Sequence, residues 1–151
     1  MLQTDVAKGV ITQPAPGFSG MLCSFRAEIS LKAAQLTANQ IVEMLALPAG
    51  CTPVDLIIDS DDIDTNAAPT VTIDVGLMSG EFGVNDSGRT CGAEFLSGAT
   101  VAQAGGGARP TIKGAFRVEP SASDRSIGIK IGTAPATAAD GKIGLTLIYR
   151  G

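Results

Sequence analysis

The chain has 151 residues, of which 44% are hydrophobic and 17% are charged, and its formal net charge is −4. A chain of this length folds by default as one domain with a substantial core. Its 11 Lys and Arg residues are scattered singly, which argues against a basic footprint for DNA or RNA. It contains no histidine, so a Ser-His-Asp or Cys-His site cannot form within one chain. We therefore expect a binding protein or a structural protein and not an enzyme.

The first twenty residues differ in character from the rest of the chain. They include two prolines and three glycines and show little periodicity. Such a segment contributes little to a core, so we expect residues 1–20 to form an extended arm and residues 21–151 to form one domain. If the arm orders against a neighbouring subunit, Val10, Ile11 and Phe18 are the candidate partner contacts.

Apolar and polar residues alternate along most of the remaining chain, and a period of two indicates strands with one buried face. The predicted strands span residues 23–31, 54–59, 70–77, 112–118, 127–131 and 143–149. Residues 41–47 suit a strand, although a helical turn fits them as well. Residues 93–103 carry apolar side chains near helical spacing and predict a short helix, which the glycines at 105–107 would end. The expected fold is all-β, an antiparallel β-sandwich or jelly roll with one short helix.

Two polar stretches resemble ligand-binding motifs, but the spacing of their residues does not match those motifs. The acidic stretch from Asp59 to Asn66 has Ile63 where an EF-hand needs an oxygen ligand and Thr70 where it needs glutamate. We interpret it as a turn-capping loop, with a cation site of another kind or a subunit contact as alternatives. The three glycines before Ala108 match no phosphate-binding motif. We expect no metal and no cofactor.

The three cysteines, Cys23, Cys51 and Cys91, are widely spaced and form no CxxC pair. They are typical of buried thiols in a reducing compartment. The amino terminus has no basic stretch followed by an apolar one, so we expect no secretory signal. No apolar run approaches the roughly 18–20 residues that span a bilayer, so we expect no membrane partner.

A resemblance adds to this interpretation. The turn LPAG at 47–50, the connection DSDDIDT at 59–65, the strand PTVTIDVG at 69–76 and the turn QAGGGAR at 103–109 resemble the capsid cement or decoration proteins of tailed bacteriophages. The resemblance covers about half the chain and carries no catalytic motif. It implies a jelly-roll or related β-sandwich that assembles as a homodimer or homotrimer on the exterior of the capsid.

The function expected from the resemblance is that of a virion subunit, made in the host cytoplasm, which binds and stabilises the shell of major capsid protein. A tail, fibre or head-completion component is the alternative within the virion. A ligand- or carbohydrate-binding β-sandwich is the alternative from another class, but it would use exposed aromatic side chains, and the chain has one Tyr and five Phe.

Overall fold

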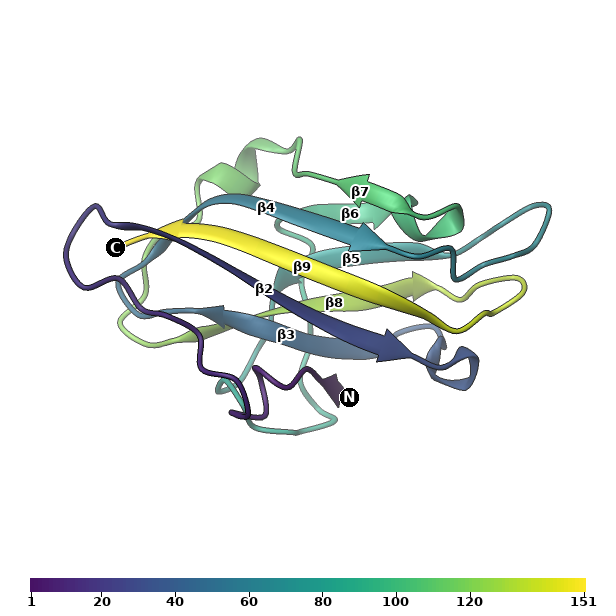
Figure 1. The fold of residues 1–151 in the computed structure, drawn as a ribbon, viewed down its shortest axis with the longest axis horizontal. Coiled ribbons are helices and arrows are strands. Elements are labelled where there is room, and N and C mark those ends of the chain that lie inside the picture. Colours follow the sequence, from purple (N-terminus) through teal and green to yellow (C-terminus); the bar gives the residue numbers. More distant parts are fainter.

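The computed structural model describes all 151 residues, which form two β-sheets packed face to face (Figure 1). One sheet, here called the β2 sheet, has the strand order β2-β9-β4-β7, and the other, the β3 sheet, has the order β1-β3-β8-β5-β6. The strands are β1 (Leu2–Gln3), β2 (Leu22–Leu31), β3 (Ile41–Leu47), β4 (Thr52–Ser60), β5 (Thr72–Leu77), β6 (Leu96–Ala99), β7 (Gly106–Ala108), β8 (Arg125–Thr133) and β9 (Gly141–Arg150). The prediction of an all-β sandwich is confirmed.

The strand pairs are nested along the sequence. The strand β2 pairs with β9, β3 with β8, β4 with β7 and β5 with β6, all antiparallel. The outermost of these pairs runs from Leu22 opposite Arg150 to Leu31 opposite Gly141, so strands near the two ends of the chain are paired over their whole length. Because these contacts are remote in sequence, the sheets form only when most of the chain is in place.

The core lies between the two sheets and is built by the alternating strands. From the β3 sheet, Ile127, Ile129 and Ile131 of β8 are fully buried. From the β2 sheet, Leu145 and Leu147 of β9 are equally buried. Burial of such a side chain contributes about 1.5–3 kcal/mol, which accounts for the dominance of the two central strands in the core.

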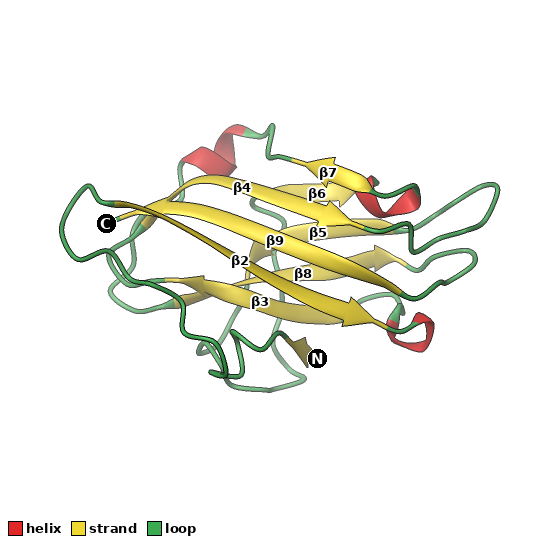
Figure 2. Cartoon of the chain, viewed as in Figure 1, coloured by secondary structure: helices red, strands yellow, loops and turns green.

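The short helix predicted for residues 93–103 is wrong. Residues Leu96–Ala99 form strand β6, and Val101–Gln103 form one 3-10 turn (Figure 2, where helical turns are red). Gly98 has a φ of 62°, outside the right-handed helical region, so an α-helix cannot run through it. Of the three glycines expected to end a helix, Gly106 and Gly107 lie instead in β7, and Gly105 directly precedes it. No helix in the structure is long and apolar enough to cross a bilayer.

The strand predicted for residues 112–118 is also wrong. Lys113–Phe116 form a 3-10 turn, and the apolar side chains that suggested a buried face are largely exposed, Ile112 at 43% and Phe116 at 54%. Prolines at 110 and 120 border this segment, and proline cannot donate a hydrogen bond to a neighbouring strand. Alternation without a partner strand is not sufficient to make a strand.

The carboxylate of Asp64 holds two connections together at one end of the sandwich. Its Oδ2 accepts hydrogen bonds from the backbone N–H groups of Thr70, Val71 and Ala136 at 2.7, 3.1 and 3.0 Å, and its Oδ1 accepts one from Thr137 at 2.9 Å. Burial acts to raise the pKa of Asp64, but the four backbone donors together hold it well below its usual value. The carboxylate therefore has a structural role.

The substitution Asp64→Asn is expected to lower the melting temperature at pH 7. The amide nitrogen of asparagine is itself a hydrogen-bond donor, so it cannot accept the bonds that a carboxylate oxygen accepts from the backbone N–H groups. The pKa of Asp64 is lower in the folded chain than in the unfolded chain, so its contribution is complete above the unfolded value of about 3.9 and is lost as pH falls through the folded value. The difference in melting temperature between wild type and variant should therefore shrink below about pH 4. Melting curves between pH 3 and pH 7 test this, and a difference independent of pH would contradict it.

Candidate functional site

The beginning of the chain packs along the edge of the β3 sheet. Strand β1 runs parallel to β3, with Leu2 opposite Val42, and the following Thr4 and Val6 are buried. Further along, the amide of Gln13 donates to the carbonyl of Ala46 at 2.7 Å and accepts from its N–H at 3.0 Å. Within the first twenty residues the exposed positions are 5, 8–12, 14–15 and 17–20. The role of residues 1–20 as an arm stays a proposal, and these positions are the parts open to a partner.

The three candidate contact residues are exposed but lie in two places. The exposed fractions are 72% for Val10, 49% for Ile11 and 74% for Phe18. The N–H groups of Val10 and Ile11 donate to the carbonyl of Asp5, in the turn that follows β1. Phe18 belongs to another turn, where Gly20 donates to the C-terminal Gly151 at 2.7 Å, well away from the N-terminus (Figure 1). A partner that touches all three must cover a broad surface.

A buried ion pair fixes the N-terminal segment to the sheet. Glu43 of β3 and Arg89 of the loop before β6 lie 2.8 Å apart, with side chains 0% and 3% exposed. The second oxygen of Glu43 accepts from the amide of Gln3 at 2.8 Å, and the hydroxyl of Ser126 donates to Glu43 at 2.5 Å. The carboxylate therefore joins β1, β3, β8 and the loop that carries Arg89.

Arg89 also donates hydrogen bonds to its own loop and to β8. Its Nε donates to the carbonyl of Ser79 at 2.6 Å, and its Nη1 donates to the carbonyl of Val84 at 2.8 Å. Its Nη2 donates to the hydroxyl of Ser126 at 2.6 Å. With these partners the guanidinium fixes the loop in place, and it has no free face for a ligand.

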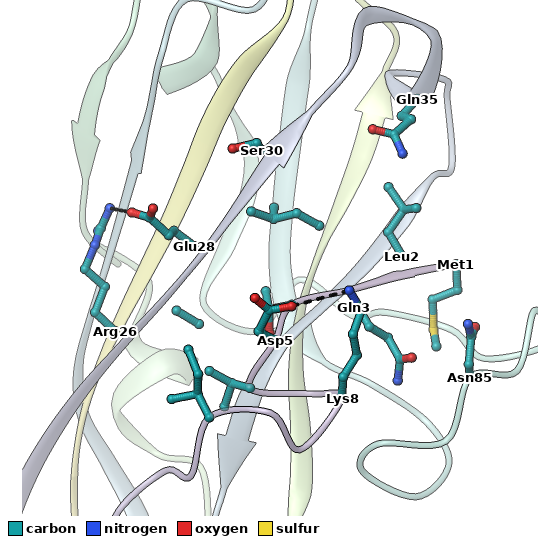
Figure 3. A pocket seen from close by; sticks show the side chains of 15 residues that line it. Met1, Leu2, Gln3, Asp5, Lys8, Arg26, Glu28, Ser30, Gln35 and Asn85 are labelled. Atoms are coloured by element: carbon teal, nitrogen blue, oxygen red, sulfur yellow. Dashed lines mark hydrogen bonds and ion pairs between the residues drawn. The ribbon is translucent and has the colours of Figure 1, made fainter.

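A hollow of about 630 Å³ lies between the N-terminal segment and β2. Figure 3 shows Arg26, Glu28 and Ser30 on the β2 side, and Asp5 and Lys8 on the other. The ionic groups are paired on their own sides. Arg26 pairs with Asp59 at 2.9 Å and with Glu28 at 3.5 Å, Glu28 also pairs with Lys142 at 2.9 Å, and Lys8 pairs with Asp5 at 3.5 Å. The hollow has polar and charged rims of no net charge, and it has no nucleophile activated by a neighbouring base.

The carboxylates of Asp59, Asp61 and Asp62 have separate hydrogen-bond partners. Asp59 pairs with Arg26, Asp61 accepts the N–H of Lys142 at 2.8 Å, and Asp62 accepts the N–H of Asp64 at 3.0 Å. No group of three or more acidic, cysteine or histidine side chains is arranged to hold a metal ion. Most of these carboxylates organise the connection after β4.

The cysteines are free, with Cys51 and Cys91 buried and Cys23 half-buried. Burial raises the pKa of the Cys91 thiol to about 12, and burial likewise raises the pKa of Cys51. Because the thiolate is the reactive form, these two thiols are inert at neutral pH.

The structure defines a β-sandwich protein. Its distinctive features are the edges of its two sheets and its exposed apolar side chains. Neither a protein-family model nor a curated protein matches the sequence. Solved structures do match. A chain in the capsid of Ralstonia phage GP4 is 44% identical, with 98% of this chain and 96% of that chain covered and a TM-score of 0.93.

Two further structures agree on the fold. A chain of the cyanophage Pam1 capsid is 27% identical, with 93% of this chain and 91% of that chain covered and a TM-score of 0.70. A chain of the Helicobacter pylori bacteriophage KHP30 capsid is 16% identical, with 87% and 94% covered and a TM-score of 0.55, which shows the fold alone. The chain therefore belongs to the family of bacteriophage capsid proteins represented by the Ralstonia phage chain, and it is a virion structural protein.

Proposed function

We propose that the protein is a cement or decoration subunit that binds the exterior of a phage capsid and stabilises the shell of major capsid protein. The observation that carries the proposal is the match of nearly the whole chain to a chain in the Ralstonia phage capsid at 44% identity. Many weak contacts repeated over a shell give a large total stabilisation even when each one is modest. An enzymatic role is not part of the proposal, because the chain has no histidine and its buried thiols are inert.

Two properties support this function. The nested strand pairs support the jelly-roll form of the sandwich, a form common among viral capsid proteins. The surface keeps apolar side chains exposed at Val10, Ile11 and Phe18, which water alone does not favour. We assign these three residues to the contact with the major capsid protein, and we place the subunit in the host cytoplasm until it assembles.

The test is binding to shells from which the subunit has been removed. The purified chain should rebind them saturably and raise the temperature at which they release DNA. Failure to bind under any salt condition would refute the proposed function.

Replacing Val10, Ile11 and Phe18 together with serine should lower the affinity for stripped shells more than tenfold and leave the melting temperature of the free protein unchanged. Each side chain would bury enough surface on the shell to contribute about 1.5–3 kcal/mol. The matched control replaces Val84 and Ile112 with serine, which are exposed apolar residues at 48% and 43% in other loops. If the triple variant and the control variant bind stripped shells with equal affinity, Val10, Ile11 and Phe18 do not hold the subunit on the shell.

We also expect the free chain to form a homodimer or homotrimer, because its low charge leaves strand faces suited to symmetric contact. Light scattering at micromolar concentration measures this. A mass that stays at 15.3 kDa would contradict self-association in solution.

A further inference from the structure

The strand β2 is the longest outer strand in the molecule. It is an outer strand of the β2 sheet, has ten residues and pairs with β9 without a register shift. The other outer strands, β7, β6 and β1, have three, four and two residues. Proteins usually shorten, bulge or block such edges, because free backbone groups pair readily with another strand. β2 contains no proline and no bulge.

The direction of the free backbone groups follows from the hydrogen bonds at the ends of the strand. Gly151 donates to the carbonyl of Met21, so residue 21 faces β9. In an antiparallel pair the backbone groups of successive residues point to opposite edges. The N–H and C=O groups of Arg26, Glu28 and Ser30 therefore point to the open edge, and no hydrogen bond from the rest of the chain reaches them there.

The hollow beside the N-terminal segment lies along this part of the edge. Its β2 side consists of residues 26–30, which span about 17 Å in an extended strand. Leu2, Val6 and Ile11 of the N-terminal segment contribute apolar surface to it, and Ala27 and Ile29 do so from β2. Figure 3 shows the segment facing β2 across the hollow. The space has free backbone partners on one side, and its lining combines apolar side chains with polar and charged ones.

We propose that this hollow takes one extended strand of the shell protein, which pairs with the open edge of β2. The inference rests on the proposed function. The strand has no net charge over about five residues, because the β2 side is neutralised by the pairs of Arg26 with Asp59 and of Glu28 with Lys142, and the other side by the pair of Lys8 with Asp5. Its alternate side chains are apolar and cover Leu2 and Ile29. The N-terminal segment closes the other side of the hollow, so we expect a single extended strand to fit there better than the edge of a second folded copy.

The test uses two matched serine-to-proline variants and shells stripped of the subunit. Ser30 and Ser24 are both exposed, and both N–H groups point to the open edge, so neither substitution removes a bond to β9. Only Ser30 lines the hollow. Ser30→Pro should reduce the affinity for stripped shells at least tenfold, whereas Ser24→Pro should bind as wild type. Equal affinity of folded Ser30→Pro and wild type would overturn the proposal.

Hydrogen exchange of the unaltered protein provides a second reading that needs no substitution. The amides of residues 26, 28 and 30 should exchange at least tenfold more slowly on the shell than in the free chain. Unchanged exchange on the shell would overturn the proposal, although the binding itself would still support the cement function. The same protection in the free chain, with a dimer mass that Ser30→Pro abolishes, would assign the edge to a second copy and also overturn it.

Discussion

Replacing Ile73 with aspartate is expected to prevent the protein from folding. Ile73 is fully buried in β5, where it lies opposite Ile131 of β8 and Ala99 of β6. An unpaired carboxylate in this place costs several kcal/mol, in addition to the packing that is lost. The total is comparable to the roughly 5–15 kcal/mol that stabilises a whole domain.

Circular dichroism and the soluble fraction after expression measure the effect of Ile73→Asp. The matched control is Leu22→Asp, which places the same charge in a strand at a side chain that is 61% exposed. The control should give a folded, soluble protein with a melting temperature near wild type. A folded Ile73→Asp variant would show that this face of β5 is not part of the core.

Replacing Arg89 with methionine should be the next most damaging change. It leaves the carboxylate of Glu43 buried beside β8 without its cationic partner. Breaking a buried pair from one side typically costs about 3–5 kcal/mol. The loop around Arg89 would also lose the bonds to Ser79 and Val84. Urea unfolding should show a midpoint far below that of the wild type.

The double variant Glu43→Leu with Arg89→Met separates lost charge pairing from lost loop anchoring. If the uncompensated carboxylate causes most of the damage, the double variant should be more stable than Arg89→Met alone, since an apolar pair often replaces a buried ion pair at little cost. A double variant less stable than Arg89→Met would mean that the bonds of Glu43 to Gln3 and Ser126 dominate.

The central strands of the sandwich could be predicted from the sequence because their alternation coincides with burial. Ile127, Ile129 and Ile131 alternate in the sequence and are buried in β8. The strand at residues 41–47 remained ambiguous, because it is almost continuously apolar. The structure explains the pattern, since the N-terminal segment and the Arg89 loop pack against β3 and bury Glu43 and Ala46.

The errors arose where local pattern and tertiary context disagree. Helical spacing between Phe95 and Ala102 is accidental, and Gly98 with its positive φ lies in β6 where the pairing with β5 shifts register. The ion pair of Glu43 with Arg89 could not be foreseen, because the two residues are far apart in the sequence and each resembles a surface charge. The open edge of β2 has one signal in the sequence, which is a ten-residue alternating run without proline or glycine.

Difference imaging of phage particles tests the central claim most directly. Electron cryomicroscopy reconstructions of particles with and without this protein should differ by density on the outer surface of the shell, at the junctions between neighbouring major capsid subunits. One strand of the shell protein should continue the β2 sheet in that density. Density confined to the tail or to the inner surface of the shell would contradict the account.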